Sequence, residues 1–574
     1  MRDGRPGSNL RSNSTNLQLP VYTTSLQQQI LMADSDVPGI FLTDHDTPPG
    51  TVLLIKDDGG NETHGQRRIV LSPLPSSDPN EPLNWSTARK TCNFTLVLAV
   101  TCLIFTALSI QQIFWQLMVV DLNVTYAQLN NAMSVNFVGL AMGCVFFIPF
   151  AKKFGRRPVY LISTALMLVT SFWAAEIKTL AELYITNLLQ GLAGATNEAI
   201  VQITIADLFF VHHRGGMNAL YMTMMMIGSF LTPMAAGAQA TRQGWRWSYR
   251  TMGIFNAVIF VLFVVFYEES KYTPTIEGVT PTARPTDGVQ QIPGDESGNK
   301  SLVKGATRTE EHSISGPPLD HIFPMKTWAQ RLSLVTYTPE PIWPYFYRPF
   351  EILFTFPAVL CCGLQYACGV IWLTILSSVI ALVFPLPPYE FTPEKIGYMS
   401  VGPFIGNLIG SFYGGFLGDW SIKYFSRRNS GYYEPEMRLY ILHLPAVALC
   451  GGLIMFGVTI DRGMHWILPS IAGALFGFGL GSISDACLTL VIDSYMEITG
   501  DAFTGVAFLR NAFSIGIPFA ISPWMEHSGL TKMFVACGFI SLGVTLTLLG
   551  MVMYGKRIRR ATAKRYHQMA SKSG

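Results

Sequence analysis

The chain has 574 residues, of which 49% are hydrophobic and only 13% are charged. Because average soluble proteins are about 25% charged, the composition excludes a string of soluble domains and predicts a membrane protein. The 40 Lys and Arg residues nearly balance the 37 Asp and Glu residues, so we expect no nucleic-acid partner. The nine cysteines fall mainly in apolar stretches and not at metal-ligand spacing, so we expect no metal site and no cofactor.

Residues 1–90 are polar and rich in Ser, Asn, Asp, Gly and Pro, a composition typical of a disordered tail. Apolar stretches of about 20 residues follow, which is the length that crosses a bilayer. An N-terminal half of residues 91–268 contains six predicted spans, at 93–118, 129–150, 158–177, 181–207, 216–239 and 250–267.

A polar segment at 269–347, rich in Pro, Thr, Ser and Gly, predicts a linker. The C-terminal half, residues 348–555, contains six more predicted spans, at 350–384, 396–418, 439–460, 466–492, 503–524 and 532–554. The stretch at 350–384 is too long for one straight span, so we expect it to include a surface extension. The predicted fold class is an all-α membrane protein with twelve transmembrane helices in two six-helix, pseudo-symmetric halves.

Lys and Arg residues gather in alternate loops, which orients the chain because cytoplasmic loops are enriched in these residues. The basic loops contain Lys152, Lys153, Arg156 and Arg157, then Lys423, Arg427, Arg428 and Arg438, and the tail at 556–574 is basic as well. We therefore expect both termini and the linker to be cytoplasmic. Asn123 lies in the sequon of the first outer loop and is a predicted glycosylation site.

Short motifs occur at matching places in the two predicted halves. Gly155-Arg156-Arg157-Pro158 follows the second span, and Gly415 and Asp419 precede Arg427-Arg428 in the second half. Gln190-Gly191 lies in the fourth span. These motifs resemble the major facilitator superfamily, although Lys152 stands where the family has Asp and Asn187 where it has Arg.

Three further segments are similar to fungal members of the 12-helix drug:proton antiporter branch of that family. They are Pro82-Leu83-Asn84-Trp85-Ser86, Trp245-Arg246-Trp247 and Pro435-Glu436-Met437-Arg438-Leu439. The resemblance implies a monomeric secondary transporter, not an enzyme, that works by alternating access. No Gly-Lys-Ser/Thr phosphate-binding loop is present in the sequence, so an ion gradient is the expected energy source.

The leading hypothesis is proton-coupled efflux of a drug, toxin or secondary metabolite across the plasma membrane. Its partners are then a small molecule, protons and the lipid bilayer. Proton-coupled uptake of a nutrient or organic cation, such as a polyamine, is the second hypothesis. A non-transporting membrane sensor, with the tail and linker as signalling segments, is the third.

Two carboxylates inside the spans are the main candidates for function. A charge at a helix centre costs about 2.5–3.5 kcal/mol on insertion scales, and Glu198 and Asp485 lie in the fourth and tenth spans. The resemblance places these spans around a central cavity. Each carboxylate is a candidate proton carrier or counter-ion, and the alternative is a helix–helix hydrogen bond made by a neutral acid.

Polar residues in the first and seventh spans are candidates for the cavity wall. They are Gln111, Gln112, Gln365 and Tyr366. Hydrogen bonds between helices are the alternative.

The basic loops predict an inner gate in each half. Arg156 and Arg157 are expected near Asp207, and Arg427 and Arg428 near Asp419 and Asp493. Anchoring to the cytoplasmic surface is the alternative for each arginine. Arg510 is expected either to pair with Asp493 or to reach the cytoplasmic interface.

Glycines recur at steps of four in two spans of the second half. They are Gly402, Gly406, Gly410, Gly414 and Gly418 in one, and Gly473, Gly477 and Gly481 in the other. Small residues on one stripe let helices pack closely, so these stripes predict a helix–helix contact.

Overall fold

The computed structural model describes residues 48–53, 78–272, 325–337, 341–429 and 431–570. Most of the tail expected at 1–90 and much of the linker expected at 269–347 lie outside the described residues. In the first part of the chain the helices are η1 (Pro82–Asn84), α2 (Thr87–Ile113), α3 (Trp115–Leu122), α4 (Tyr126–Phe154), α5 (Arg156–Ala175), α6 (Leu180–Leu208), α7 (Val211–Met226), the π-helical turn η2 (Ile227–Leu231), α8 (Thr232–Gln243) and α9 (Trp245–Phe266).

The second part of the chain is also mainly helical. Its helices are α10 (Trp328–Arg331), α11 (Trp343–Thr355), α12 (Pro357–Val383), α13 (Pro393–Tyr398), α14 (Val401–Phe412), the π-helical turn η3 (Tyr413–Leu417), α15 (Gly418–Arg428), η4 (Pro435–Ile441), α16 (His443–Asp461), α17 (Ile467–Ser494), η5 (Met496–Ile498), α18 (Thr499–Ile515) and α19 (Ile517–Ala570). Strands β1 (Val52–Leu53) and β2 (Tyr432–Tyr433) pair antiparallel. The chain is therefore an all-helical protein apart from this short pairing in its described part.

Nine helical segments in the described ranges are long and apolar enough to cross a membrane. The segment that contains α6 is not among them, because polar residues such as Asn187, Gln190 and Glu198 lower its mean hydropathy. Helix α19 consists of two helical stretches that meet at a bend. The bend is at Gly529, whose φ of +76° is a left-handed conformation that glycine adopts easily.

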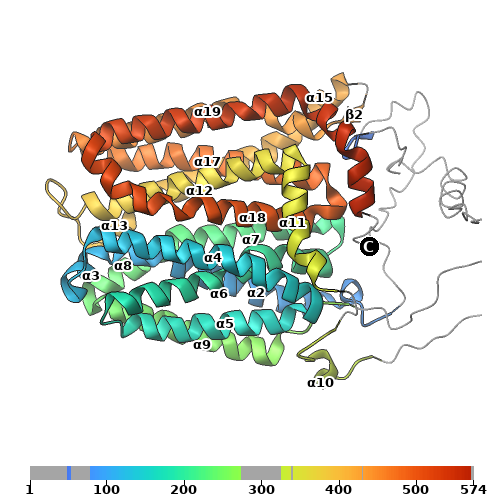
Figure 1. Cartoon of the computed structure of the whole chain (residues 1–574), viewed down its shortest axis with the longest axis horizontal. Helices are drawn as coiled ribbons and strands as arrows, with labels where there is room; N and C mark the ends of the chain where they lie inside the picture. Colours follow the sequence, from blue (N-terminus) through green and yellow to red (C-terminus); the bar gives the residue numbers. More distant parts are fainter. Residues whose placement is uncertain (1–47, 54–77, 273–324, 338–340, 430, 571–574) are drawn as a thin grey trace, which may run out of the picture.

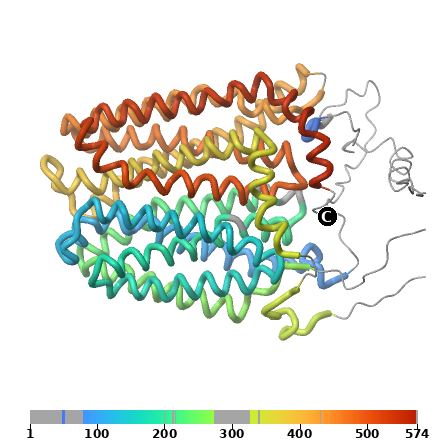
Figure 2. Tube along the Cα trace, in the orientation of Figure 1, coloured from blue at the N-terminus to red at the C-terminus, as the bar shows by residue number. Residues whose placement is uncertain are grey.

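Helices from the two parts of the chain gather in two groups. Figure 1 shows α2 to α9 lying together beside a second group formed by α12 to α19. The tube in Figure 2 shows the same division by colour, from blue and green to yellow and red. We call the end of the bundle near the C-terminus the inner end and the opposite end the outer end.

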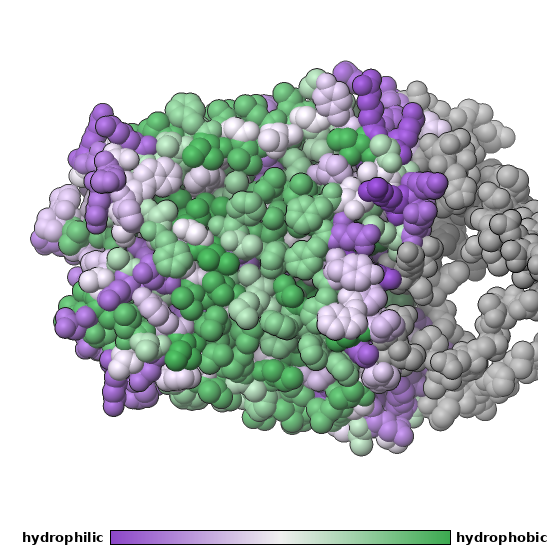
Figure 3. All heavy atoms as spheres, viewed as in Figure 1, coloured by the Kyte–Doolittle hydropathy of each residue, from purple (hydrophilic) through white to green (hydrophobic). Residues whose placement is uncertain are grey.

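Apolar side chains cover the middle of the bundle. Figure 3 shows a broad hydrophobic band between hydrophilic side chains at the two ends. Phe255, Val258 and Val447 are more than half exposed on this surface. A continuous exposed apolar surface of this size is stable only against lipid, so the band marks the part of the molecule that lies in the bilayer.

The long apolar stretch at 350–384 is divided between two helices. Helix α11 ends before Phe356, whose extended backbone separates it from α12. Figure 1 shows α11 crossing the direction of α12, and α11 contacts α4, α12 and α18. Trp343 and Phe354 of α11 remain 73% and 69% exposed, as suits an amphipathic helix at the bilayer surface.

The glycine stripes form the expected contact, because α14 packs against α17. A Cβ atom on Gly406 would lie 1.9 Å from the Ala474 carbonyl oxygen, and one on Gly477 would lie 2.3 Å from that of Pro403. The two backbones touch, so Gly406 and Gly477 are required by the close approach, whereas a Cβ atom on Gly418 would lie 3.5 Å from an Arg438 nitrogen, in ordinary contact and away from α17.

The tail expected to be disordered at 1–90 is ordered where the structure describes it. Arg559 is fully buried and donates to both carboxylate oxygens of Glu436, at 2.8 and 2.7 Å, and to the carbonyl oxygen of Pro49. This contact holds β1 against β2 at the inner end. The tail expected at 556–574 accordingly continues as helix to Ala570. The polar composition of the tail did not reveal the order, because Glu436 and Arg559 come from distant parts of the chain.

Candidate functional site

A cavity of about 1760 Å³ lies between the two groups of helices. Side chains of α2, α4, α6, α7, α12, α14, α17 and α18 line it. It reaches Lys152, Asp493 and His567 at the inner end of the bundle. At the outer end α8 packs against α13, where a Cβ atom on Gly237 would lie 2.5 Å from the Pro393 carbonyl oxygen. The cavity is therefore bounded by tight packing at the outer end.

Glu198 and Arg510 form an ion pair across this cavity, and their side chains are only 4% and 7% exposed. Asn511 donates to the second oxygen of Glu198 at 2.8 Å. The Arg510 guanidinium also donates to the Tyr366 hydroxyl at 3.3 Å and lies 5.2 Å from the centre of its ring. Glu198 on α6 is thus tied to α18 of the other group.

Two expectations for these residues change. Arg510 was expected to pair with Asp493 or to reach the cytoplasmic interface, and it does neither, because it is buried beside Glu198. No local pattern indicated this pair, since 312 positions separate Glu198 from Arg510. Asn511 was not predicted as a site residue at all.

Asp485 lines the cavity on α17 and is partly buried. Its carboxylate forms no ion pair and accepts no hydrogen bond from the residues that the structure describes. Its nearest neighbours include Gly414, where a Cβ atom would lie 3.2 Å from Oδ2. The cavity wall therefore holds Glu198, which is paired with a cation, and Asp485, which is available to a ligand; Asp493, paired with Arg438, and Glu497 also line it.

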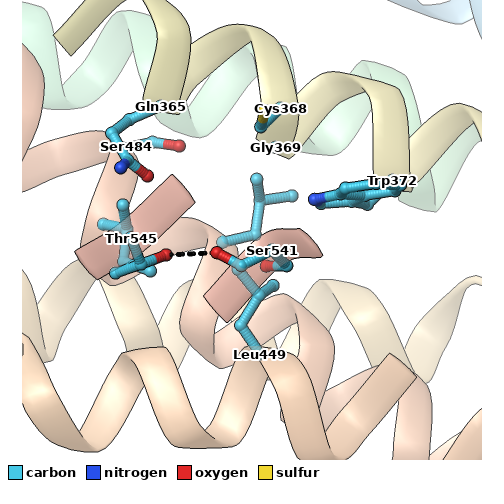
Figure 4. A pocket seen from close by; sticks show the side chains of 10 residues that line it. Gln365, Cys368, Gly369, Trp372, Leu449, Ser484, Ser541 and Thr545 are labelled. Carbon is cyan, nitrogen blue, oxygen red and sulfur yellow. Dashed lines mark hydrogen bonds between the residues drawn. The ribbon is translucent and has the colours of Figure 1, made fainter. Parts of the chain in front are cut away.

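The four polar wall candidates separate into two pairs. Gln112 and Tyr366 line the cavity, and Gln112 donates to Ser378 of α12 at 3.3 Å. Gln365 instead points into a narrow crevice among α12, α16, α17 and α19 (Figure 4). There it donates to the Val544 carbonyl oxygen of α19. Gln111 is 3% exposed and lies away from the cavity lining. Gln365 therefore makes the interhelical hydrogen bond that was the alternative.

The inner end of the first group contains one of the expected arginine–carboxylate contacts. Arg156 Nε lies 2.9 Å from Asp207 Oδ2. Arg157 does not join this pair: its guanidinium donates to the carbonyl oxygens of Val264, at 2.7 Å, and Leu332. The carboxylate of Glu269 accepts from the backbone N–H groups of both arginines, at 2.9 and 3.0 Å, and so caps α5.

In the second group a different arginine makes the expected contacts. Arg438 lies 3.1 Å from Asp419 and 3.0 Å from Asp493. Arg427 and Arg428 are exposed and form no ion pair with a described residue; Arg428 lies 4.6 Å from the Tyr424 ring. The expected pairing was wrong because α15 continues as helix through both arginines and carries them away from α17. Arg438 belongs to η4, which packs against α17, and this packing brings Arg438 to Asp493.

The Asp493 carboxylate has one more neighbour. The Tyr433 hydroxyl donates to it, and burial, with the nearby Asp493 charge, raises the pKa of Tyr433. Because Tyr433 belongs to β2, its hydrogen bond to Asp493 connects the short β1–β2 sheet to the cluster of Arg438, Asp419 and Asp493.

One ion pair at the inner end joins the two groups directly. Lys152 at the end of α4 pairs with Asp501 in the first turn of α18. A carboxylate at a helix N-terminus is stabilised by the helix dipole. The departure from the family motif at Lys152 was the available sequence signal, and the partner Asp501 was missed.

Asn123 is exposed at the outer end, between α3 and α4, with φ +53°. No group of three or more His, Cys, Asp or Glu side chains that could hold a metal ion occurs in the part of the chain that the structure describes.

The fold and the cavity define a polytopic membrane protein with a central binding space between two groups of helices. The family model of the Major Facilitator Superfamily matches residues 97–517. The chain belongs to this superfamily, so it is a membrane-embedded transporter of small molecules and not an enzyme.

Known proteins of similar sequence fit the fungal drug-transporter branch. Protein HOL1 of Saccharomyces cerevisiae is 27% identical, with 87% of this chain and 92% of HOL1 covered. Multidrug transporter TPO1_1 of Candida glabrata is 26% identical, with 86% and 80% covered. The solved structure of the proton:xylose symporter XylE has a TM-score of 0.53 over 82% of this chain and 97% of XylE at 12% identity, which shows a shared fold.

Proposed function

We propose that this transporter exports a small amphipathic organic cation across the plasma membrane by alternating access, in exchange for protons. The observation that carries the proposal is the large cavity between the two groups of helices, with Asp485 as a carboxylate that the described residues leave unpaired. A buried carboxylate without a protein cation favours a cationic ligand or a proton. Multidrug transporter TPO1_1 is among the similar proteins and supports an organic substrate.

The proposal includes twelve crossings in two halves of six, at 91–268 and 348–555, and a monomer. Both termini and the linker at 269–347 are then cytoplasmic, because the basic residues of the inner end mark the cytoplasmic face. Asn123 is then extracellular and open to glycosylation. In this orientation the cavity reaches the cytoplasmic side.

The cavity wall suits bulky and varied substrates. Ligand pockets usually measure about 300–1,000 Å³, so a cavity of about 1760 Å³ accepts molecules of different shapes. Met222, Met225 and Met226 of α7 and Phe105 of α2 belong to the wall. Methionine side chains adapt to irregular apolar ligands, and aromatic rings attract cations.

Asp485 and Glu198 have different roles in the proposed exchange. Asp485 forms no ion pair with a described residue and serves as the counter-ion of the cationic substrate in this proposal. Glu198 binds Arg510 across the cavity, and a proton on Glu198 cancels that attraction. Protonation of Glu198 then frees the two halves to move, while Arg510 keeps Tyr366 and Asn511 as partners.

The inner gate consists of the clusters at Arg156, at Arg438 and at the Lys152–Asp501 pair. Each of the first two clusters joins helices of one half only: Arg156 contacts Asp207 in the first half, and Arg438 contacts Asp493 in the second. Only the third joins α4 to α18. In the proposed cycle the third pair forms and breaks as the inner end closes and opens.

Proton-coupled uptake of an organic cation such as a polyamine is the second candidate. The same observation favours it, because Asp485 binds a cation whichever way the cation travels. The direction depends on whether proton and cation cross together or in opposite directions, which the experiment measures.

Purified protein in liposomes that contain the pH-sensitive dye pyranine tests both candidates, with ethidium and radiolabelled spermidine as probes. We expect ethidium to move against protons. Asp485→Asn should lower this flux at least about tenfold, because the cation loses its counter-ion. Glu176→Gln is the matched control, since Glu176 pairs with Arg250 on the exposed surface. Movement of spermidine together with protons would select the second candidate, and a lack of proton movement with either probe would refute both.

A further inference from the structure

The described piece of the linker, residues 325–337, contains helix α10 and leaves most of its large apolar side chains exposed. Each of these side chains is at least 49% exposed: Met325, Trp328, Leu334, Val335 and Tyr337. None of them lines the transport cavity. A surface in contact with water rarely exposes so many large apolar side chains in so short a segment, so the segment marks an interaction surface.

Hydrogen bonds hold this segment against the inner end of the first group of helices. The Arg157 guanidinium donates to the Leu332 carbonyl oxygen. The Thr336 N–H donates at 2.8 Å to the carbonyl oxygen of Phe154, the last residue of α4. Each contact uses a backbone group of the segment, so these contacts fix its position and leave its apolar side chains exposed.

A row of aromatic rings connects the segment to the apolar band that faces the bilayer. Phe146, Phe150 and Phe154 follow one another at steps of four on α4, and the first two are exposed. The rings of Phe150 and Phe154 stack with their centres 5.6 Å apart, and the Phe154 ring lies 6.4 Å from that of Tyr337. The exposed side chains of the segment therefore continue the lipid-facing surface at its inner edge.

The place of α10 in the fold is level with the lipid headgroups. Figure 1 shows α10 at the inner end, at the edge of the bundle formed by α5 and α9. Helix α11, with its exposed Trp343 and Phe354, lies at the same end. Tryptophan and tyrosine side chains are enriched at this level because their rings have both an apolar body and a polar group.

Basic side chains border the apolar ones. Residues 325–337 include Lys326 and Arg331 but no Asp or Glu, and Lys153 Nζ lies 5.1 Å from the centre of the Tyr337 ring. None of these three cations forms an ion pair with a residue that the structure describes. The nearby carboxylate of Glu269 caps α5 instead. Basic residues beside apolar side chains at a bilayer surface attract the phosphates of anionic lipids.

We propose that residues 325–337, together with Lys153, form a docking surface for anionic lipids in the bilayer leaflet at the inner end. The apolar side chains of the segment insert between the headgroups, while Lys153, Lys326 and Arg331 bind the lipid phosphates. Arg157 positions the surface through its hydrogen bond to the segment. The surface requires neither a transport direction nor protons, so this inference stands independently of the proposed exchange.

Contact with lipid is tested by photocrosslinking of the full chain in liposomes of phosphatidylcholine and phosphatidylglycerol. The photoreactive residue p-benzoylphenylalanine replaces Trp328 or Leu334, and mass spectrometry identifies what each position captures. We expect lipid adducts at both positions. The control places the same residue at Glu497, which is exposed at the inner end but lines the cavity, and should capture no lipid. Capture of peptides from 269–324 in place of lipid, or no lipid adduct at either position, would overturn the proposal.

The preference for anionic lipid is tested by titrating phosphatidylglycerol or phosphatidylcholine into the purified protein and counting bound lipids by native mass spectrometry. The triple variant Lys153→Ala/Lys326→Ala/Arg331→Ala should weaken binding of phosphatidylglycerol at least about tenfold, because each basic residue near an anionic surface adds to the attraction. Binding of phosphatidylcholine should stay unchanged.

The matched control is Lys423→Ala/Arg427→Ala/Arg428→Ala, which removes three basic side chains from the inner end of the second group. It should bind phosphatidylglycerol like wild type. An equal loss in both triple variants, or no loss in the first, would overturn the role of Lys153, Lys326 and Arg331.

Discussion

Arg510 of α18 and Glu198 of α6 form a buried ion pair that joins the two groups of helices in the middle of the bundle. Both side chains are less than a tenth exposed, so the pair is shielded from water and salt. Removing one partner of a buried pair leaves an unpaired charge, which is more costly than removing both. A change that neutralises one partner alone should therefore be more costly than a change that neutralises both.

The first prediction concerns Glu198→Gln. It should lower stability by about 3–5 kcal/mol, since Arg510 stays buried without its carboxylate, and it should abolish proton-coupled flux. Thermal unfolding in detergent and the pyranine assay measure the two effects. The double variant Glu198→Gln/Arg510→Gln should recover part of the stability but none of the coupling. A normal pH dependence of flux in Glu198→Gln would contradict the assignment of the proton to Glu198.

The second prediction separates the arginines at the inner end of the second half. Arg438→Ala removes the partner of both Asp419 and Asp493, so transport should fall at least about tenfold. Arg427→Ala and Arg428→Ala are the matched controls and should transport like wild type, because neither arginine forms an ion pair with a described residue. The rate of ethidium efflux is measured for the three variants. An equal fall in this rate in all three would show that transport requires only basic charge at this face and not the specific contacts of Arg438.

The third prediction concerns Lys152 and Asp501, the pair that joins α4 to α18. In a double-mutant cycle with Lys152→Ala and Asp501→Asn, we expect a coupling energy of about 1 kcal/mol or more, because both groups are mostly buried. Lys153→Ala with Asp501→Asn is the control and should be additive. Thermal unfolding measures the cycle. Additive effects of Lys152→Ala and Asp501→Asn would show that the pair does not hold the inner end together.

The fourth prediction is a pH dependence at Glu269, which follows α9 and lies outside the spans. Burial raises the pKa of this carboxyl, although backbone N–H groups of Arg156 and Lys271 oppose the rise. A raised folded-state pKa means that the folded protein binds the proton more tightly than the unfolded chain does. The contribution of Glu269 to stability therefore increases as pH falls through its folded pKa and is lost as pH rises.

Glu269→Gln checks this sign. The variant should be less stable than wild type by about 1–3 kcal/mol, because an amide NH₂ group faces backbone donors that the carboxylate accepted. The gap should widen between pH 7 and pH 5 when unfolding is followed by tryptophan fluorescence. Glu176→Gln, on the exposed outer surface, should show no such widening. A gap that narrows on acidification would contradict the raised pKa.

Several features could be predicted from the sequence because they depend on local pattern. Several expected spans fall on single helices, such as 181–207 on α6 and 466–492 on α17, because a chain in the bilayer must satisfy its own backbone hydrogen bonds. The steps of four between Gly402, Gly406 and Gly410 predicted the α14–α17 contact, because small residues on one face permit only close packing. The Arg156–Asp207 contact followed from the positions of loop and helix end.

Tertiary structure decided the partners of every isolated polar side chain. Glu198 and Asp485 were equivalent in the sequence, one carboxylate in each half, yet Arg510 reaches only Glu198. Gln111 and Gln112 are neighbours in sequence but face different surroundings, because one residue turns a helix by about 100°. The order of the segment at 48–53 likewise depends on Arg559, which lies more than five hundred positions away.

The sequence by itself thus determined that this is a helical membrane protein, because composition and hydrophobic length are properties of each segment alone, while short motifs such as Gly155-Arg156-Arg157-Pro158 supplied the resemblance to the superfamily. Only the tertiary structure decided that Glu198 is paired with Arg510 and that Arg438, rather than Arg427 or Arg428, contacts Asp419 and Asp493. These depend on helix rotation and on contacts between distant segments, and a single unaligned sequence contains no record of either.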